Sequence, residues 1–576
     1  MTDKEKRLAA LRSRRWLAPD DIRSFAHRQR LLQMGLRREE FMTRPIVAVI
    51  NTWSDLSPCH AHLRERAESV KRGILEAGGL PFELPAMSLG EVMVKPTAMA
   101  YRNFLAMETE ELLRSLPIDG AVLMGGCDKT TPGLLMGAIS ADLPCIYVPA
   151  GPMLNDRYKG QRVGAGTHTK TFWNDYVVGK VSQPEWVALE ARMTRSPGTC
   201  NTMGTASTMT SITEAMGFSL PGASSIPAMD AAHPRMAAAS GARIVDMIWE
   251  DLRPRRLLTA DSVRNAIAVH MALGGSTNAV VHLIAIAGRA GIPLTLQQYI
   301  EAGGDIPVLA NLYPTGDHLM EDFYYAGGLP ALLKELAPRL HLECLTATGR
   351  TLGENIESAV NLDPEVIRPL SSPVVQAQAL AVLRGNLAPS GAVIKPSAAS
   401  ERLLEHTGPA LVFDSMEDMT RRIHDPELAV DENTVLVLRN GGPVGASGMP
   451  EWGNLPIPKK LLEAGVHDIV RISDSRMSGT HAGTCVLHVS PEAAVGGPLA
   501  LVRTGDMIRL DVPAGRLDVL LDEAQLEERR QQWKPPKTDR KRGYLRLYVE
   551  HVSQADQGCD FDFLSGWQEP DEPVIF

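Results

Sequence analysis

The chain has 576 residues, of which 44% are hydrophobic, 22% charged and 5% aromatic; this globular composition excludes a collagen-like, coiled-coil or disordered protein. Its 59 Lys and Arg residues against 68 Asp and Glu residues give a net charge of -9, which argues against nucleic acid as a partner. The amino-terminal segment has basic residues but no apolar signal region, so we expect a cytoplasmic protein.

Two apolar runs, at 45–53 and 118–124, predict buried parallel strands that each lead into a helix. The first is followed by a predicted helix over 63–76. The second is followed by a helix that we expect to begin with Thr131 as its N-cap and Pro132 at its first position. This pattern predicts an α/β domain.

The segment 265–288 contains no Asp, Glu, Lys or Arg and is long enough to cross a bilayer. Its centre reads GGSTN at 274–278, and it also contains His270 and His282. Helix-breaking and polar residues of this kind are costly in a membrane. We therefore predict a pair of buried helices that is broken at the glycines, and no membrane partner.

The sequence pattern changes after about residue 370, where short β-type runs dominate. The predicted fold class is therefore α/β, with a doubly wound α/β domain over residues 1–370 and a β-barrel-like domain over residues 371–576. The β-type runs are 391–395, 410–413, 433–440, 468–473, 484–490 and 498–512.

Three of the seven cysteines, Cys59, Cys127 and Cys200, lie in polar or Gly-rich stretches between a strand pattern and a helix pattern. Ligands bind beyond the carboxyl ends of strands in open α/β sheets, so these cysteines can converge on one crevice. Three thiolates suit an iron–sulfur cluster and would leave one iron open to a substrate oxygen. Three unrelated loop cysteines are the alternative that spacing alone leaves open.

Oxygen donors of the kind that Mg²⁺ prefers occur at Glu91, Asp128 and Glu451. Any one of these acids could equally be a solvated loop residue or a helix cap. Asp128 differs because it directly follows Cys127, so that two Lewis acids could lie near one small substrate.

The segment 473–480 follows a predicted strand and contains Ser478 and Thr480. A Ser-Gly-Thr sequence is also common in ordinary turns. No His and Asp pair adjoins Ser478, so the sequence gives no support for a hydrolase triad.

Seven collinear motifs resemble the dihydroxy-acid and sugar-acid dehydratase family. They are NTWSDLSPCHAHLR (51–64), GGCDKTTPG (125–133), PGTCNTMGTAST (197–208), LGGSTNAVVHL (273–283), APSGAVIK (388–395), GGPVGASGMPE (441–451) and SDSRMSGTHAG (473–483). The resemblance implies an enzyme, a hydro-lyase, with metal sites in its α/β domain and a β-barrel domain over them. It also implies a homodimer or homotetramer.

The resemblance further assigns roles to the matching residues of this chain. It implies cluster ligation by Cys59, Cys127 and Cys200, Mg²⁺ ligation by Glu91, Asp128, Glu451 and a carbamylated Lys129, and proton removal by Ser478, with Thr480 as the next candidate for the base.

The residues NTWSDL and SRMSGT depart from the branched-chain branch of this family and resemble the sugar-acid branch. This implies a [2Fe-2S] cluster, Mg²⁺ and dehydration of an aldonate, such as L-arabinonate or D-xylonate, to the 2-keto-3-deoxy acid. Dihydroxyacid dehydratase of branched-chain amino-acid synthesis is the alternative. An electron carrier without a substrate is a rival from another class, but it would not use the acids or the Ser478 loop.

Overall fold

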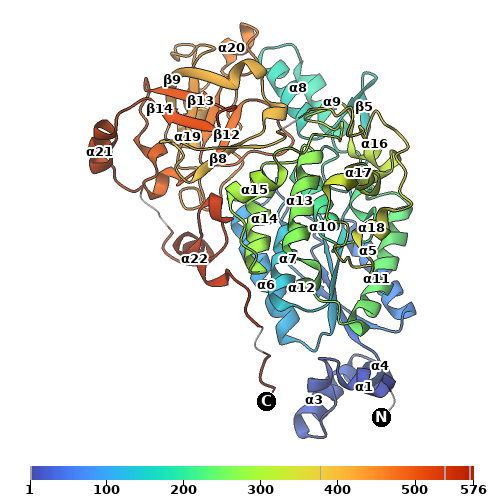
Figure 1. The fold of residues 1–576 in the computed structure, drawn as a ribbon. Coiled ribbons are helices and arrows are strands. Elements are labelled where there is room, and N and C mark those ends of the chain that lie inside the picture. Colours follow the sequence, from blue (N-terminus) through green and yellow to red (C-terminus); the bar gives the residue numbers. More distant parts are fainter. Residues whose placement is uncertain (1–2, 377, 537–539, 570–571, 576) are drawn as a thin grey trace.

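The amino-terminal part of the protein is built on a parallel sheet, and a β-rich part lies beside it (Figure 1). The structure is a computed structural model and describes residues 3–376, 378–536, 540–569 and 572–575. The parallel sheet has the order β2-β1-β3-β4. Its strands are β1 (Ile46–Asn51), β2 (Leu80–Pro85), β3 (Gly120–Gly125) and β4 (Cys145–Pro149). The predicted strands at 45–53 and 118–124 are confirmed.

Helices cover both faces of this sheet, as a doubly wound fold requires. The helix α5 (Leu63–Glu76) connects β1 to β2, and α7 (Thr130–Ala141) connects β3 to β4 in the opposite direction along the sheet. Because such crossovers are right-handed, α5 and α7 lie on opposite faces. The helix α11 (Ala232–Trp249) packs beside α5, and α6 (Arg102–Ser115) packs beside α7. The predicted fold class and the helix over 63–76 are confirmed.

The start of α7 differs from the prediction by two residues. The helix begins at Thr130 with Lys129 as its N-cap, so Thr131 is not the cap and Pro132 is not the first residue. The reason is that the Thr130 hydroxyl accepts a hydrogen bond from the Gly126 N–H (3.1 Å) and donates one to the Cys127 carbonyl (2.9 Å). The turn after β3 therefore closes earlier.

The charge-free segment forms two buried helices, as predicted. They are α13 (Ala260–Ala272) and α14 (Asn278–Arg289), and residues 273–277 separate them. In the part of the chain that the structure describes, no helix is long and apolar enough to span a bilayer.

The β-rich part is a mixed sheet that is nearly closed into a barrel. Its strand order is β14-β13-β9-β10-β11-β12-β8-β7, and an isolated bridge between Arg384 and Arg516 joins its two ends. The strands are β7 (Ala381–Leu383), β8 (Gly391–Ile394), β9 (Glu405–Phe413), β10 (Val435–Leu438), β11 (Arg471–Ser473), β12 (Cys485–Ser490), β13 (Met507–Asp511) and β14 (Arg516–Val519). The barrel-like domain is confirmed, whereas the boundary at residue 370 stays a prediction.

One predicted β-type run, at 498–512, is a strand only at its end. Residues Pro498–Leu501 form a short 3-10 helix, and the strand β13 begins at Met507. Proline cannot donate the backbone hydrogen bond that a strand interior requires.

The outer surface of the barrel shares a hydrophobic core with the α/β domain. Met477 and Leu487 from the barrel are buried in the same cluster as the strands β1 and β3. This packing positions the Ser478 loop beside the parallel sheet.

Candidate active site

The three candidate cluster cysteines converge at one edge of the parallel sheet. Cys59 follows β1 and Cys127 follows β3, and these adjacent strands lie where the chain reverses its direction along the sheet. Such a switch point creates a crevice at the carboxyl ends of the strands. The third cysteine, Cys200, comes from the loop before α10 (Thr205–Ala215).

The three cysteines lie close enough to one another to raise the pKa values of their thiols. A hydrogen bond with Cys127, burial, and the nearby charges of Cys127, Cys200 and Asp128 all raise the pKa of Cys59. Burial, followed by the charges of Asp128, Cys127 and Glu451, raises the pKa of Cys200. The structure thus brings three thiols and two carboxylates into one site.

The candidate oxygen donors lie next to these thiols. The Glu91 backbone N–H donates a hydrogen bond to Cys127 Sγ at 3.4 Å. The fully buried Lys129 Nζ lies 3.2 Å from Glu91 Oε2 and 3.4 Å from Asp128 Oδ2. Glu91, Asp128 and Lys129 are therefore a single buried charge cluster.

Arg476 joins this cluster to the barrel-like domain. Its guanidinium donates to Glu91 Oε1 and to Glu451 Oε1, each at 2.8 Å. The sequence motifs assign no role to Arg476, although it stands two residues before Ser478. A buried group of three acids requires cations nearby, and this requirement could have pointed to Arg476 in the sequence.

The two glutamates respond in opposite ways to this environment. Burial favours the protonated form of Glu91, but Lys129 and Arg476 outweigh burial and lower the pKa of this carboxyl. Burial and the neighbouring Glu91 carboxylate raise the pKa of Glu451 despite Arg476. Lys129, which lies 3.2 Å from Glu91, accounts for the difference, because Arg476 bonds to both acids at the same distance.

The donors fit an iron–sulfur cluster and Mg²⁺ by their chemistry. Thiols are soft ligands for iron, and carboxylates are hard ligands for Mg²⁺. Glu91 Oε2 is buried and receives no hydrogen bond from the described residues, although Lys129 lies near it. Among the described residues no three His, Cys, Asp or Glu side chains are already oriented to hold a metal ion. The carboxylates instead face Lys129 and Arg476.

The candidate base lies on the loop that follows Arg476. Ser478 Oγ is 2.9 Å from Thr480 Oγ1 and accepts a hydrogen bond from the Thr480 backbone N–H at 3.4 Å. The residue between them must be small, because a Cβ on Gly479 would lie 2.4 Å from Ser276 Oγ. The loop thus packs tightly on residues of the α/β domain.

His60 is a second residue that sequence reasoning missed. Its Nε2 accepts a hydrogen bond from the Cys127 backbone N–H at 2.9 Å, and its Nδ1 lies 2.9 Å from Ser88 Oγ. Burial and the nearby His62 lower the pKa of His60 to about 3, so the ring is neutral. A neutral ring can accept this hydrogen bond, which fixes the turn that carries Cys127.

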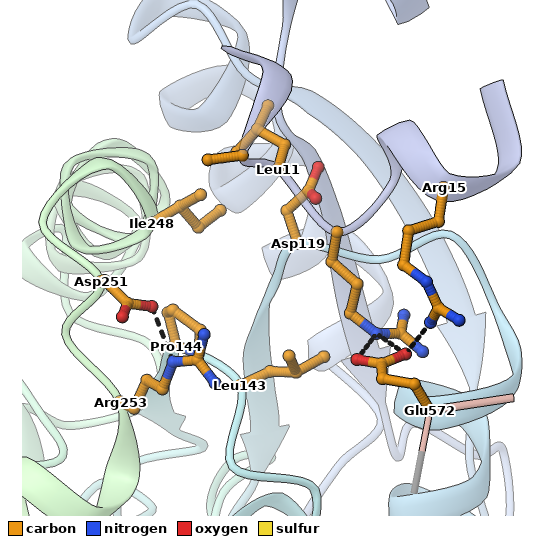
Figure 2. A pocket seen from close by; sticks show the side chains of 11 residues that line it. Leu11, Arg15, Asp119, Leu143, Pro144, Ile248, Asp251, Arg253 and Glu572 are labelled. Carbon is orange, nitrogen blue, oxygen red and sulfur yellow. Dashed lines mark hydrogen bonds and ion pairs between the residues drawn. The ribbon is translucent and has the colours of Figure 1, made fainter. Parts of the chain in front are cut away.

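Another cavity, of about 260 Å³, lies at the opposite edge of the parallel sheet (Figure 2). It lies beside Asp119, which precedes β3, and none of the donor residues lines it. Arg12 and Arg15, which line it, both pair with Glu572, and Figure 2 shows Arg15 beside Glu572. This cavity therefore lies where the two ends of the chain pack together, away from the candidate active site.

The fold and the site define a two-domain enzyme whose α/β crevice gathers thiols, carboxylates and a serine loop from the barrel. The N-terminal model of dihydroxy-acid/6-phosphogluconate dehydratases matches residues 44–355, and the C-terminal model matches residues 365–559. The chain belongs to this family and is a dehydratase, a hydro-lyase. The resemblance inferred from the motifs is confirmed.

Relatives from several organisms match nearly the whole chain. The 6-deoxy-6-sulfo-D-gluconate dehydratase of Pseudomonas putida is 62% identical over 100% of both chains. The L-arabinonate dehydratase of Rhizobium leguminosarum bv. trifolii is 50% identical over 96% of both chains. The dihydroxy-acid dehydratase of Carboxydothermus hydrogenoformans is 39% identical over 95% of this chain and 99% of the relative.

Proposed function

We propose that this dehydratase removes water from C2 and C3 of a sugar acid and releases the 2-keto-3-deoxy acid. The observation that carries the reaction is the Arg476 bridge, which holds the Ser478 loop of the barrel against the buried acids of the crevice. The higher identity to sugar-acid dehydratases, 62% and 50% against 39% for a dihydroxy-acid dehydratase, supports the substrate class. L-Arabinonate, D-xylonate and 6-deoxy-6-sulfo-D-gluconate are the first substrates to test.

We assign the cofactor ligands as the motifs suggest. Cys59, Cys127 and Cys200 would hold a [2Fe-2S] cluster, and Glu91, Asp128, Glu451 and a carbamylated Lys129 would hold Mg²⁺. When bound, these two groups would supply Lewis acids that stabilise negative charge on substrate oxygens. The short separations among these residues support the assignment.

In this proposal Ser478 takes the proton from C2 of the substrate. The Thr480 N–H, which already donates to Ser478 Oγ, would stabilise the serine as an alkoxide. The C2–H electron pair forms the C2–C3 double bond, and the C3 hydroxyl leaves with its bonding pair. The resulting enol takes a proton at C3 and becomes the ketone, so no oxidant or reductant is needed.

The residues beside the serine favour a polyhydroxy acid over a branched aliphatic one. Thr480 and His481 follow Ser478 in the loop, and Asn454 bonds to the His481 ring. Polar groups of this kind can bond to substrate hydroxyls and offer little apolar surface to an aliphatic side chain. Dihydroxyacid dehydratase activity therefore stays the weaker alternative.

A keto-acid assay of anaerobically purified enzyme tests the proposed function. The panel contains aldonates of four to six carbons, 6-deoxy-6-sulfo-D-gluconate and 2,3-dihydroxyisovalerate. We expect keto acid from at least one sugar acid at a kcat/KM well above that for 2,3-dihydroxyisovalerate. The opposite preference would establish the branched-chain activity in its place.

Removal of Mg²⁺ should abolish turnover without removing the cluster. The ligands assigned to Mg²⁺ are oxygen donors, and those assigned to iron are thiols, so a chelator such as EDTA should separate the two. We expect activity to fall to background while visible absorption persists, and added Mg²⁺ to restore activity. Full activity after verified removal of Mg²⁺ would contradict the assignment.

Assembly and location are also part of the proposal. A homodimer or homotetramer is expected from the family resemblance, and light scattering on purified protein would measure it. A cytoplasmic location stays a prediction.

A further inference from the structure

A cavity of about 240 Å³ lies between the helix α8 (Thr167–Val177), the helix α9 (Gln183–Arg192) and the segment after Glu451. These helices lie near the barrel, at the boundary of the two domains (Figure 1). The residues that line the cavity are Thr169, Lys170, Trp173, Trp186, Pro456 and His481.

This cavity shares a wall with the Ser478 loop. The His481 backbone N–H donates to the Ser478 carbonyl at 3.2 Å, and the His481 side chain lines the cavity. At the start of α8, the Thr167 hydroxyl donates to the Thr480 carbonyl. No side chain fits at Gly166, where a Cβ would lie 2.1 Å from Thr480 Oγ1. The loop that carries Ser478 therefore continues directly into the wall of this cavity.

The cavity wall carries a cation without a counter-ion. Lys170 Nζ donates to the Asn454 carbonyl at 3.3 Å, but no carboxylate among the described residues lies within ion-pair distance of it. The adjacent Arg471 is already paired with Asp468 at 2.7 Å. Burial, together with Arg471, lowers the pKa of Lys170 to about 7. A bound anion would restore the charge of Lys170 by offsetting both effects.

A hydrogen-bond donor accompanies this lysine. Arg471 donates to Asn454 Oδ1 at 2.9 Å, which leaves Asn454 Nδ2 to donate to His481 Nδ1 at 2.8 Å. Burial, with Lys170 and Arg471, lowers the pKa of His481 to about 3, so the ring is neutral and its proton lies on Nε2. No described residue accepts a hydrogen bond from this Nε2–H. It is therefore free to donate to a ligand.

Two aromatic rings complete the cavity. Trp173 and Trp186 meet edge to face with centroids 5.5 Å apart, and Trp173 remains 41% exposed. Such rings provide flat apolar surface for the C–H groups of a carbon chain. The Lys170 cation, the His481 N–H and the two tryptophan rings together suit a short polyol that carries an anionic group at its end.

We propose that this cavity binds a sulfonate or phosphate group at the far end of the sugar acid, and that Lys170 and His481 select such substrates. The inference rests on the proposed sugar-acid dehydratase function and narrows its substrates to sugar acids that carry a second, terminal anionic group. Both groups are tetrahedral oxyanions that accept hydrogen bonds from Lys170 Nζ and His481 Nε2.

The test compares substrates that differ only at C6. Calorimetric binding and steady-state kinetics are measured with 6-deoxy-6-sulfo-D-gluconate, 6-phospho-D-gluconate and D-gluconate. We expect wild-type enzyme to bind an anionic acid at least about tenfold more tightly than D-gluconate, the effect of one charge-assisted hydrogen bond. The tighter anion of the two identifies the natural group.

Lys170→Gln should remove this preference, because glutamine retains hydrogen bonding but not charge. Lys180→Gln, an exposed cation just after α8, is the matched control and should retain the preference. Equal binding of D-gluconate and both anionic acids by the wild type, or an unchanged preference in Lys170→Gln, would overturn the inference. Lys170-dependent binding without keto-acid formation would uphold this inference and contradict the proposed reaction.

Discussion

Cys127→Ser should abolish both the visible absorption of the iron–sulfur cluster and the dehydratase activity. Cys127 is central to the candidate site, because its thiol contacts Cys59 and accepts the N–H of Glu91 at 3.4 Å. A serine hydroxyl is a hard and weakly acidic ligand that replaces a thiolate poorly on iron. Iron and sulfide analysis of anaerobically purified protein, together with its absorption spectrum, measures the loss.

Cys145→Ser is the matched control for this variant. Cys145 is fully buried in β4, on the same sheet, and has no role in the proposed site. This variant should retain cluster and turnover, although its stability can fall. If folded Cys127→Ser enzyme kept its full iron and sulfide content, the assignment of the cluster ligands would be wrong.

Ser478→Ala should lower kcat by at least about a hundredfold, the low end of general-base effects. KM should change little, because the serine acts mainly in the transition state. The variant should also fail to exchange the C2 hydrogen of the substrate with solvent deuterium. Steady-state kinetics and proton NMR of the recovered substrate measure the two effects.

Ser475→Ala controls for disturbance of the same loop. The Ser475 hydroxyl interacts with Ser473 Oγ at 3.1 Å and has no part in the proposed proton transfer. Its removal should leave kcat within a few-fold of the wild type. Near-normal turnover by Ser478→Ala with full cluster and Mg²⁺ content would instead move the base elsewhere, with Thr480 as the next candidate.

Much of the site could be predicted because its residues lie at the ends of regular elements. Cys59 and Cys127 each follow an apolar strand, and parallel strands place their carboxyl ends on one edge. The local sequence thus predicted both the elements and the proximity of these cysteines. The start of α7 was missed by two residues, because the Thr130 hydroxyl closes the turn through contacts that the helix pattern does not encode.

The residues that sequence reasoning missed act through contacts between distant segments. Arg476 meets Glu91 across the domain boundary, and Lys170 meets Asn454 in the same way. His60 acts on the Cys127 backbone, which is a contact that no residue-type pattern records. Pairings of this kind depend on how the barrel docks on the α/β domain, so they emerge only from the folded chain.

Proton NMR of the reaction in deuterated water tests the central claim most directly. Wild-type enzyme with cluster and Mg²⁺ is incubated with a sugar acid that carries hydrogen at C2 and C3. The account predicts a 2-keto-3-deoxy acid with one solvent deuterium at C3, because the enol is protonated there after C2 has lost its hydrogen. A keto acid without deuterium at C3 would show that the hydrogen from C2 is retained at C3 and would contradict protonation of the enol from solvent.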